Sequence, residues 1–332
     1  MKRPICVICG LLALQLVAFA QEQQFATLGD FKLQNGGVIR NCRIGYRTFG
    51  TLNSDKSNVI VFPTWAGGTT EQLKSNFGPG RLIDSTTYYV VAIDALSNGV
   101  SSSPSNSRLQ PRMRFPKFSL RDTVATQYAL LTRVLNIHRV KAVVGISMGG
   151  MQTFQWMVSY PDFMEKAIPI VGSPRLAPYD LMLWQAQIDA LMRDRDWKGG
   201  NYSTNPARAL DFAFGELLLT TPADYNRRKK REEVFADLEK ARNDAHRFDA
   251  NDKIRQAQAM MQLDISLESA KEVKAKVLVV VSKHDHVVTP GPATEFAKLL
   301  GAKLLTLDSD CGHLATSCEP RLLNSAVADF LK

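Results

Sequence analysis

The residues with the clearest capacity for chemistry are a serine and the glycines around it. Residues 145–149 read Gly-Ile-Ser-Met-Gly, which matches the pattern G-x-S-x-G. The motif follows an apolar run at 140–146 and precedes a run at 148–160 that has helical character. In that context the serine lies on a tight strand-to-helix turn, and its neighbours must be small. The motif predicts that Ser147 is a nucleophile, although a glycine turn that only packs a helix against a strand would match it too.

Two further residues have the types and the positions that a serine nucleophile needs. Asp285 follows an apolar run at 277–281, and His313 lies in the loop after the next strand candidate, 303–307. Catalytic groups of open α/β sheets gather at the carboxyl ends of strands, and the order Ser, Asp, His is typical of the α/β-hydrolase fold. We therefore expect Ser147 to attack an acyl carbon, the histidine to carry the proton, and the aspartate to orient the histidine.

The residues beside Asp285 allow a different site. His284 and His286 could bind a metal together with His313, but no cluster of carboxylates or cysteines completes a recognisable site. We expect the two flanking histidines to be loop residues near the mouth of the site. The sequence predicts neither a metal nor a cofactor.

An oxyanion hole requires two backbone N–H groups. One should belong to Met148, directly after the nucleophile, and the other to the loop 63–68 that follows the strand candidate 59–62. Within that loop Ala66 is the first choice and Trp65 the second. The loop contains Gly67 and Gly68, which would let its backbone approach the substrate, whereas an ordinary glycine turn is the alternative.

The elements that must position these residues read as an α/β protein. Helix patterns at 120–136, 148–160, 291–300 and 320–331 alternate with short apolar runs, which predicts a mostly parallel sheet with helices on both faces. The runs interpreted as strands are 31–34, 42–49, 59–62, 88–93, 140–146, 167–171, 277–281 and 303–307. Residues 175–268 show helix signals and no convincing strand. We interpret them as a helical lid inserted into a core of residues 21–174 and 269–332.

The N-terminus and the cysteines indicate export. Residues 1–20 combine a basic start, an apolar run and a final Ala-Phe-Ala, the pattern of a cleaved signal peptide, with an uncleaved anchor as the alternative. We expect a periplasmic or secreted protein without stable membrane insertion after cleavage. The remaining cysteines are Cys42, Cys311 and Cys318, so at most one internal bridge can form. A bridge between Cys311 and Cys318 would hold the histidine loop, but three buried thiols are equally compatible.

The formal net charge is +9, and much of the excess lies in the basic run 227–231. Nucleic-acid binding is one reading of such a run. A solvated helix face is the better one, because neither interleaved aromatic residues nor a known binding motif accompanies the run.

At this level of detail the chain resembles the homoserine O-acetyltransferase family of α/β hydrolases over most of its length, lid included. The carrying segments are Phe115-Pro116 with Arg121, Asp122 and Val124; Ser147-Met148-Gly149-Gly150-Met151-Gln152 with Trp156, Tyr160 and Pro161; Asp196, Trp197, Gly199, Gly200 and Tyr202; Gly78-Pro79-Gly80; and Asn98-Gly99. The resemblance implies acyl-enzyme chemistry on a small acyl ester and a homodimer built through lid helices.

The chain departs from that family in its charged substrate contacts. The family has a lid arginine for the substrate carboxylate, and the matching position here is Ile188. The family also commonly has an aspartate directly after the catalytic histidine, near the substrate amine, where this chain has Leu314. Arg193 or Arg195 could replace the missing cation. Family enzymes use acetyl-coenzyme A in the cytoplasm, whereas this chain has the features of an exported protein.

These observations lead to a ranked set of functions. An esterase-like serine acyl hydrolase is the leading prediction. An acyltransferase that moves an acyl group to an alcohol is the alternative, and a non-catalytic binding protein on the same fold is a minor one.

Overall fold

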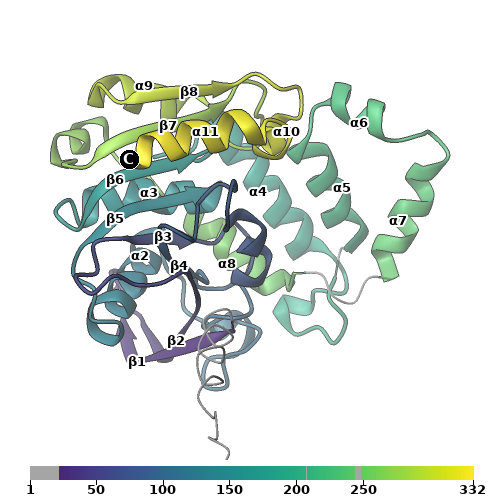
Figure 1. Cartoon of the computed structure of the whole chain (residues 1–332). Helices are drawn as coiled ribbons and strands as arrows, with labels where there is room; N and C mark the ends of the chain where they lie inside the picture. The colour runs from purple at the N-terminus through teal and green to yellow at the C-terminus, as the bar shows by residue number, and fades with distance from the viewer. Residues whose placement is uncertain (1–21, 207, 244–247) are drawn as a thin grey trace, which may run out of the picture.

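The structure is a computed structural model, which describes residues 22–206, 208–243 and 248–332 (Figure 1). The predicted signal peptide, residues 1–20, lies outside the described residues. Within the described part of the chain, no helix is both long enough and apolar enough to cross a bilayer.

The core of the protein is one eight-stranded sheet with the order β1-β2-β4-β3-β5-β6-β7-β8. Only the β1–β2 and β2–β4 pairs are antiparallel, and the other neighbours run parallel. The strands are β1 (Gln24–Lys32), β2 (Val38–Phe49), β3 (Val59–Pro63), β4 (Tyr89–Ile93), β5 (Val140–Ile146), β6 (Met164–Ile170), β7 (Lys276–Ser282) and β8 (Lys303–Leu307).

Helices cover both faces of this sheet, as Figure 1 shows. Along β3, Val59 and Val61 belong to the apolar cluster on one face, whereas Ile60 and Phe62 belong to the cluster on the other. Residues of α2 (Leu120–Ala129), α3 (Met148–Ser159) and α9 (Gly291–Leu300) belong to the first cluster, and residues of α1 (Thr70–Leu73) and α11 (Pro320–Leu331) belong to the second. The predicted α/β fold with a mostly parallel sheet is confirmed, because strands buried on both faces read as the continuous apolar runs seen in the sequence.

The helices, with their observed bounds, are α1 (Thr70–Leu73), α2 (Leu120–Ala129), α3 (Met148–Ser159), α4 (Pro178–Arg193), α5 (Arg208–Leu219), α6 (Pro222–Arg228), α7 (Glu233–Asn243), α8 (Ala250–Met261), α9 (Gly291–Leu300), α10 (Ala315–Cys318) and α11 (Pro320–Leu331). The helix expected at 120–136 ends as an α-helix at Ala129 and continues as a π-helical turn, Leu130–Val134.

The predicted first strand differs from the observed one. We expected it at residues 31–34, but β1 spans Gln24–Lys32. It is an edge strand with many exposed or half-buried side chains, and its register shifts around Gly29. An edge strand of this kind lacks a continuous apolar run, so the sequence pattern revealed only its end. The strand β6 likewise begins at Met164, three residues before the predicted start.

The segment between β6 and β7 is helical. Helices α4 to α8 occupy residues 175–268, a segment called the insertion below, and its described residues form no β-strand. Arg175 and Asp264 form an isolated antiparallel bridge that brings the two ends of the insertion together. In Figure 1 the insertion lies beside the sheet, and α6 and α7 are at its far end.

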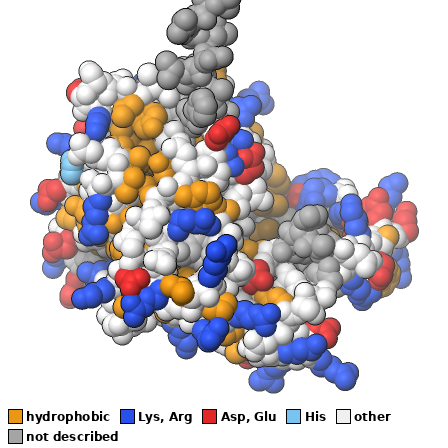
Figure 2. Space-filling view, turned by 90° about the horizontal axis from the view of Figure 1, so that it is seen from below, with side chains coloured by type: hydrophobic (Ala, Val, Ile, Leu, Met, Phe, Trp, Pro, Cys, Tyr) orange, Lys and Arg blue, Asp and Glu red, His pale blue; other side chains and the backbone are white. Residues whose placement is uncertain are grey.

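The basic run at 227–231 lies at α6 and just after it, and three of its side chains contact acidic neighbours. Arg227 and Arg228 both pair with Asp224, and Lys229 pairs with Asp237. Figure 2 shows acidic and basic side chains interspersed at the projecting end of the insertion. This arrangement is that of a solvated helix face laced with ion pairs.

Candidate active site

Ser147 lies at the junction of β5 and α3 in a strained conformation, with φ 58° and ψ −121°. Its backbone N–H donates to the carbonyl of Ile170 on the neighbouring strand, at 2.8 Å. A Cβ on Gly145 would lie 2.2 Å from the carbonyl oxygen of Gly149, and a Cβ on Gly149 would lie 2.6 Å from the carbonyl oxygen of Pro63. Both glycines are therefore required by close backbone approaches, and the turn they permit exposes the serine above the sheet.

The three predicted catalytic side chains form one hydrogen-bonded chain. Nε2 of His313 lies 2.8 Å from Oγ of Ser147, and Nδ1 lies 2.6 Å from Oδ2 of Asp285. Only 6% of the histidine and 4% of the aspartate are exposed, so water does not compete for these contacts. A neutral histidine that donates from Nδ1 to the carboxylate keeps Nε2 ready to accept the serine proton.

The loop after β7 fixes the aspartate. Oδ1 of Asp285 accepts hydrogen bonds from the backbone N–H groups of Val287 and Val288, at 2.9 and 3.0 Å, which leaves Oδ2 for the histidine. Trp184 on α4 donates from its indole to the carbonyl of Val287, at 3.3 Å. The insertion therefore braces the loop that carries the aspartate.

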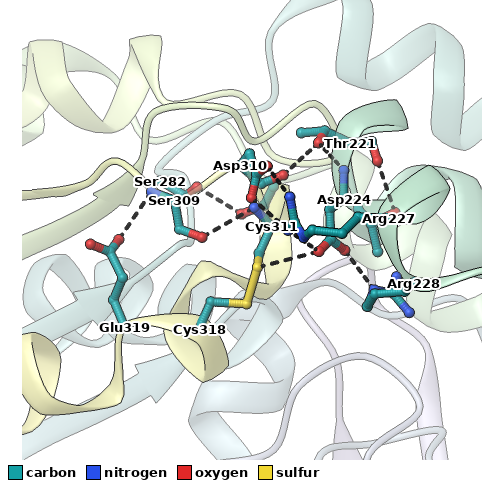
Figure 3. The surroundings of a disulfide bond; sticks show 12 residues. Thr221, Asp224, Arg227, Arg228, Ser282, Ser309, Asp310, Cys311, Cys318 and Glu319 are labelled. Carbon is teal, nitrogen blue, oxygen red and sulfur yellow. Dashed lines mark hydrogen bonds and ion pairs between the residues drawn. A yellow bond between two sulfur atoms is a disulfide. The ribbon is translucent and has the colours of Figure 1, made fainter.

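The loop that carries His313 is held by a disulfide and by the insertion (Figure 3). Cys311 and Cys318 form a disulfide, which settles the pairing that the sequence left open. Arg227 on α6 forms an ion pair with Asp310, with a contact of 2.6 Å, and Thr221 donates from its hydroxyl to the carbonyl of Asp310. His313 therefore lies in a segment that the disulfide closes into a loop and that contacts of Asp310 attach to α6 and the residue before it.

Ser282, at the end of β7, donates from its hydroxyl to the carbonyl of Gly312, at 2.7 Å, and so joins the two catalytic loops. Cys42 is a buried free thiol whose pKa burial raises to about 12, so it stays protonated and unreactive.

The loop after β3 offers the backbone groups expected for an oxyanion hole. Trp65 and Ala66 line the same cavity as the serine, and Met148 begins α3 directly after it. The N–H of Gly67 is already used, because it donates to Oε1 of Gln256 at 2.8 Å. Trp65 and Ala66 therefore remain the predicted donors of this loop.

Gln256 was not recognised in the sequence. This α8 residue accepts from Gly67 and donates from Nε2 to the carbonyl of Leu96, at 2.9 Å. It thereby fastens the loop after β3 to the insertion. No local pattern identifies such a residue, because its partner lies 189 positions away in the chain.

A cavity of about 800 Å³ opens over the serine and the histidine. Its wall is mostly apolar and includes insertion residues such as Trp184, Phe214, Leu218 and Met260. Pockets of this size and character are typical of small-molecule sites. The site can therefore accept an organic ester whose acyl carbon reaches Ser147.

The charged contacts of this cavity differ from those of the family that the sequence resembles. Ile188 is buried in the apolar core, and Leu314 lines the cavity. The expected substitutes for the missing cation, Arg193 and Arg195, are exposed and do not line it. Lys253 does line it, and burial lowers the pKa of its ammonium group to about 8.

The two histidines beside Asp285 do not gather around His313 as metal ligands would. Nε2 of His284 lies 3.2 Å from a carboxylate oxygen of Asp308, and Nε2 of His286 lies 3.1 Å from the carbonyl oxygen of Leu217. Both rings therefore have structural partners in the surrounding loops.

Comparisons with known proteins agree with the fold described above. The family model described as alpha/beta hydrolase fold matches residues 58–317. An ethyl acetate hydrolase of Pseudomonas veronii is 34% identical over 190 residues, 56% of this chain and 54% of that protein. The match to esterase relatives in sequence thus spans about half of their length.

Two other similarities extend much further. A homoserine O-acetyltransferase of Chlorobaculum tepidum is 30% identical over 335 residues, which cover 93% of this chain and 94% of that protein. The crystal structure of an acetylester hydrolase from Corynebacterium glutamicum superposes with a TM-score of 0.87 at 26% identity and covers 93% of this chain and 96% of that one. The chain therefore belongs to the α/β-hydrolase fold family and is related within it to the homoserine O-acetyltransferases, as the sequence predicted.

Proposed function

We propose that the protein is an esterase-like serine acyl hydrolase that works through an acyl-enzyme. The single observation that carries this proposal is the hydrogen-bonded chain from Ser147 through His313 to Asp285 at the floor of an apolar cavity. Hydrogen-bond contact from nucleophile to base, and from base to an orienting carboxylate, is what acyl transfer to serine requires.

The steps follow from the positions of these groups. Ser147 Oγ attacks the acyl carbon while His313 Nε2 accepts its proton. The N–H groups of Met148 and of Ala66 or Trp65 stabilise the oxyanion that forms. His313 then returns the proton to the leaving alcohol, and Asp285 stabilises the imidazolium throughout. Water activated by the same histidine hydrolyses the acyl-enzyme, which releases the acid and restores the serine.

Hydrolysis rather than transfer to homoserine is supported by the cavity. A zwitterionic amino acid needs a partner for each charge, and an unmatched buried charge costs about 1–3 kcal/mol or more. The two family positions that supply these partners are Ile188, which is buried in the core, and Leu314 on the cavity wall. Lys253 is a cation on the wall, but no described Asp or Glu lines the cavity, so the substrate amine has no acidic partner there. The structural likeness to an acetylester hydrolase supports the same conclusion.

An acyltransferase is the second candidate, favoured by the similarity to homoserine O-acetyltransferases along almost the whole chain. The two reactions differ only in whether water or an alcohol attacks the acyl-enzyme. We propose that residues 175–268 act as a lid on the core formed by residues 21–174 and 269–332. A lid that excludes water would favour transfer.

Product analysis separates the candidates. The purified protein and its Ser147→Ala variant receive an activated acetyl ester, with and without millimolar homoserine, and acetate and O-acetyl-homoserine are quantified. Acetate as the only product, absent with the variant, is expected. Substantial O-acetyl-homoserine would instead establish the transferase. A protein that neither turns over ester nor is labelled at Ser147 by a fluorophosphonate would be a binding protein.

We also propose export after cleavage near residue 20 and assembly into a homodimer through the insertion. The Cys311–Cys318 disulfide supports export, because such bonds persist in oxidising compartments. Exposed apolar side chains on α4, α5 and α7, among them Met182, Leu217 and Phe235, support the dimer. Cell fractionation with N-terminal sequencing tests the first proposal, and light scattering of the purified protein tests the second.

A further inference from the structure

We infer that Gln187 determines substrate specificity by donating a hydrogen bond to an acceptor oxygen of the substrate outside the reacting ester group. The substrate class is therefore an ester that carries a second oxygen, such as a ketone, hydroxyl or ether oxygen. This inference rests on the proposed acyl hydrolase function and goes beyond it, because the triad alone selects only an acyl group.

The side-chain amide of Gln187 is buried at the cavity wall. Gln187 is 6% exposed, and its Nε2 makes no hydrogen bond within the described part of the chain. The residue lines the cavity that also contains Ser147 and His313. Trp184, one helical turn earlier on α4, lines the same cavity, whereas Ile188 packs into the core. The amide is therefore on the face of α4 that meets the cavity.

An unsatisfied buried amide is unusual, since buried polar groups are almost always hydrogen-bonded. The neighbouring wall at Trp184, Leu218 and Met260 is apolar, so an apolar side chain at this position would fit without any desolvation cost. Gln256 on the same wall provides a contrast, because both ends of its amide have partners in the protein. The amide of Gln187 differs in that Nε2 is buried and has no partner among the described residues, so a turn of the side chain toward the cavity would give a ligand this donor without breaking a protein hydrogen bond.

The size of the cavity allows such a ligand. A cavity of about 800 Å³ lies in the range of about 300–1,000 Å³ found for drug-sized molecules, well above what a simple acetyl ester fills. The part of a larger substrate that lies beyond the ester must contact this wall. A site built to donate a hydrogen bond discriminates against an analogue without the acceptor, because the donor then stays buried and unpaired.

Matched ester pairs test the inference. One pair differs on the acyl side, ethyl 4-oxopentanoate against ethyl 4-methylidenepentanoate. The other differs on the alcohol side, 3-oxobutyl acetate against 3-methylbut-3-enyl acetate. Each pair exchanges a carbonyl oxygen for a methylene group of similar shape. We expect the wild type to prefer the carbonyl member of one pair by about 10-fold or more in kcat/KM, as a buried hydrogen bond implies.

The variant Gln187→Met keeps the length of the side chain and removes the donor. It should reduce that preference to about 1, and its Tm should not fall, because Nε2 has no hydrogen-bond partner to lose among the described residues. Gln185→Met, an exposed position on the same helix, is the control and should retain the preference.

The inference is overturned if the wild type shows no preference above about 3-fold in either pair, or if Gln187→Met retains the preference. Hydrolysis of an activated acetyl ester that depends on Ser147 is measured in parallel. With that activity intact, a negative result contradicts the role of Gln187 alone. If the Ser147-dependent hydrolysis of the acetyl ester is itself absent, the proposed function and this inference are both contradicted.

Discussion

The Cys311–Cys318 disulfide should position His313, and its removal tests this directly. The bond closes a loop with a sequence separation of 7. Loop-closure entropy for a ring of that length predicts a stabilisation of about 2.4 kcal/mol at 25 °C. Unfolding a chain of 332 residues has an entropy of roughly 0.7 kcal/mol/K, so the variant Cys311→Ala/Cys318→Ala should melt about 3 °C lower.

The effect on catalysis should be larger than this small change in stability. Without the disulfide, the histidine loop keeps the Ser282–Gly312 hydrogen bond and the Arg227–Asp310 ion pair. We therefore expect the loop to shift slightly rather than to unfold. A misplacement of about 1 Å at a catalytic group can cost on the order of 100-fold in rate, so kcat should fall by about 10- to 100-fold.

The assay combines thermal melts with esterase kinetics, with and without a phosphine reductant. The reductant should bring the wild type to the Tm and kcat of the double variant and leave the variant unchanged, because Cys42 is then its sole cysteine among the described residues. If the reduced wild type and the double variant both keep the full Tm and kcat, the disulfide does not position the histidine and the reasoning fails.

Three further predictions follow from single contacts. Gln256→Leu frees the loop after β3, so it should lower kcat by about 10-fold or more with little change in KM, measured by steady-state kinetics, because oxyanion contacts strengthen in the transition state. Asp285→Asn should lower kcat by roughly 10,000-fold at an unchanged Tm, since the histidine loses its orienting carboxylate. A loss in kcat of less than about 10-fold would contradict that role. Asp252 has a pKa raised to about 8, chiefly by burial, so the folded state holds a proton that the unfolded state has lost between about pH 4 and pH 8. Stability contributed by this group therefore falls as pH rises through that window, and Asp252→Asn should reduce the loss between pH 5 and pH 8 in denaturant titrations.

The positions of the sheet and of the serine turn could be predicted because their signals are local. Strands buried on both faces require apolar runs such as residues 140–146, and the serine turn requires glycines at fixed positions. The edge strand β1 was predicted at the wrong residues because many of its side chains are exposed or half-buried, so it does not need a continuous apolar run.

The supporting contacts of the site could not be predicted, because they depend on packing between distant segments. Gln256 and Gln187 are ordinary polar residues of helices in the sequence. Only the folded chain shows that the amide of Gln256 has partners at both ends, whereas Nε2 of Gln187 has none among the described residues. The pairing of the disulfide was equally hard to predict, since Cys42, Cys311 and Cys318 allow three pairings. Cys42 is buried on β2, near one edge of the sheet, whereas Cys311 and Cys318 follow β8 at the other edge, so the fold selects the observed bond.

The order of the strands also decides when the protein can become active during synthesis. Ser147 and His313 are 166 residues apart, and the strands that deliver the aspartate and the histidine follow the whole insertion. A growing chain can therefore form the serine turn long before any base exists to activate it. The emerging protein should stay inert toward esters around it until β7 and β8 join the sheet, so the act of completing the fold is also the act that switches on its chemistry.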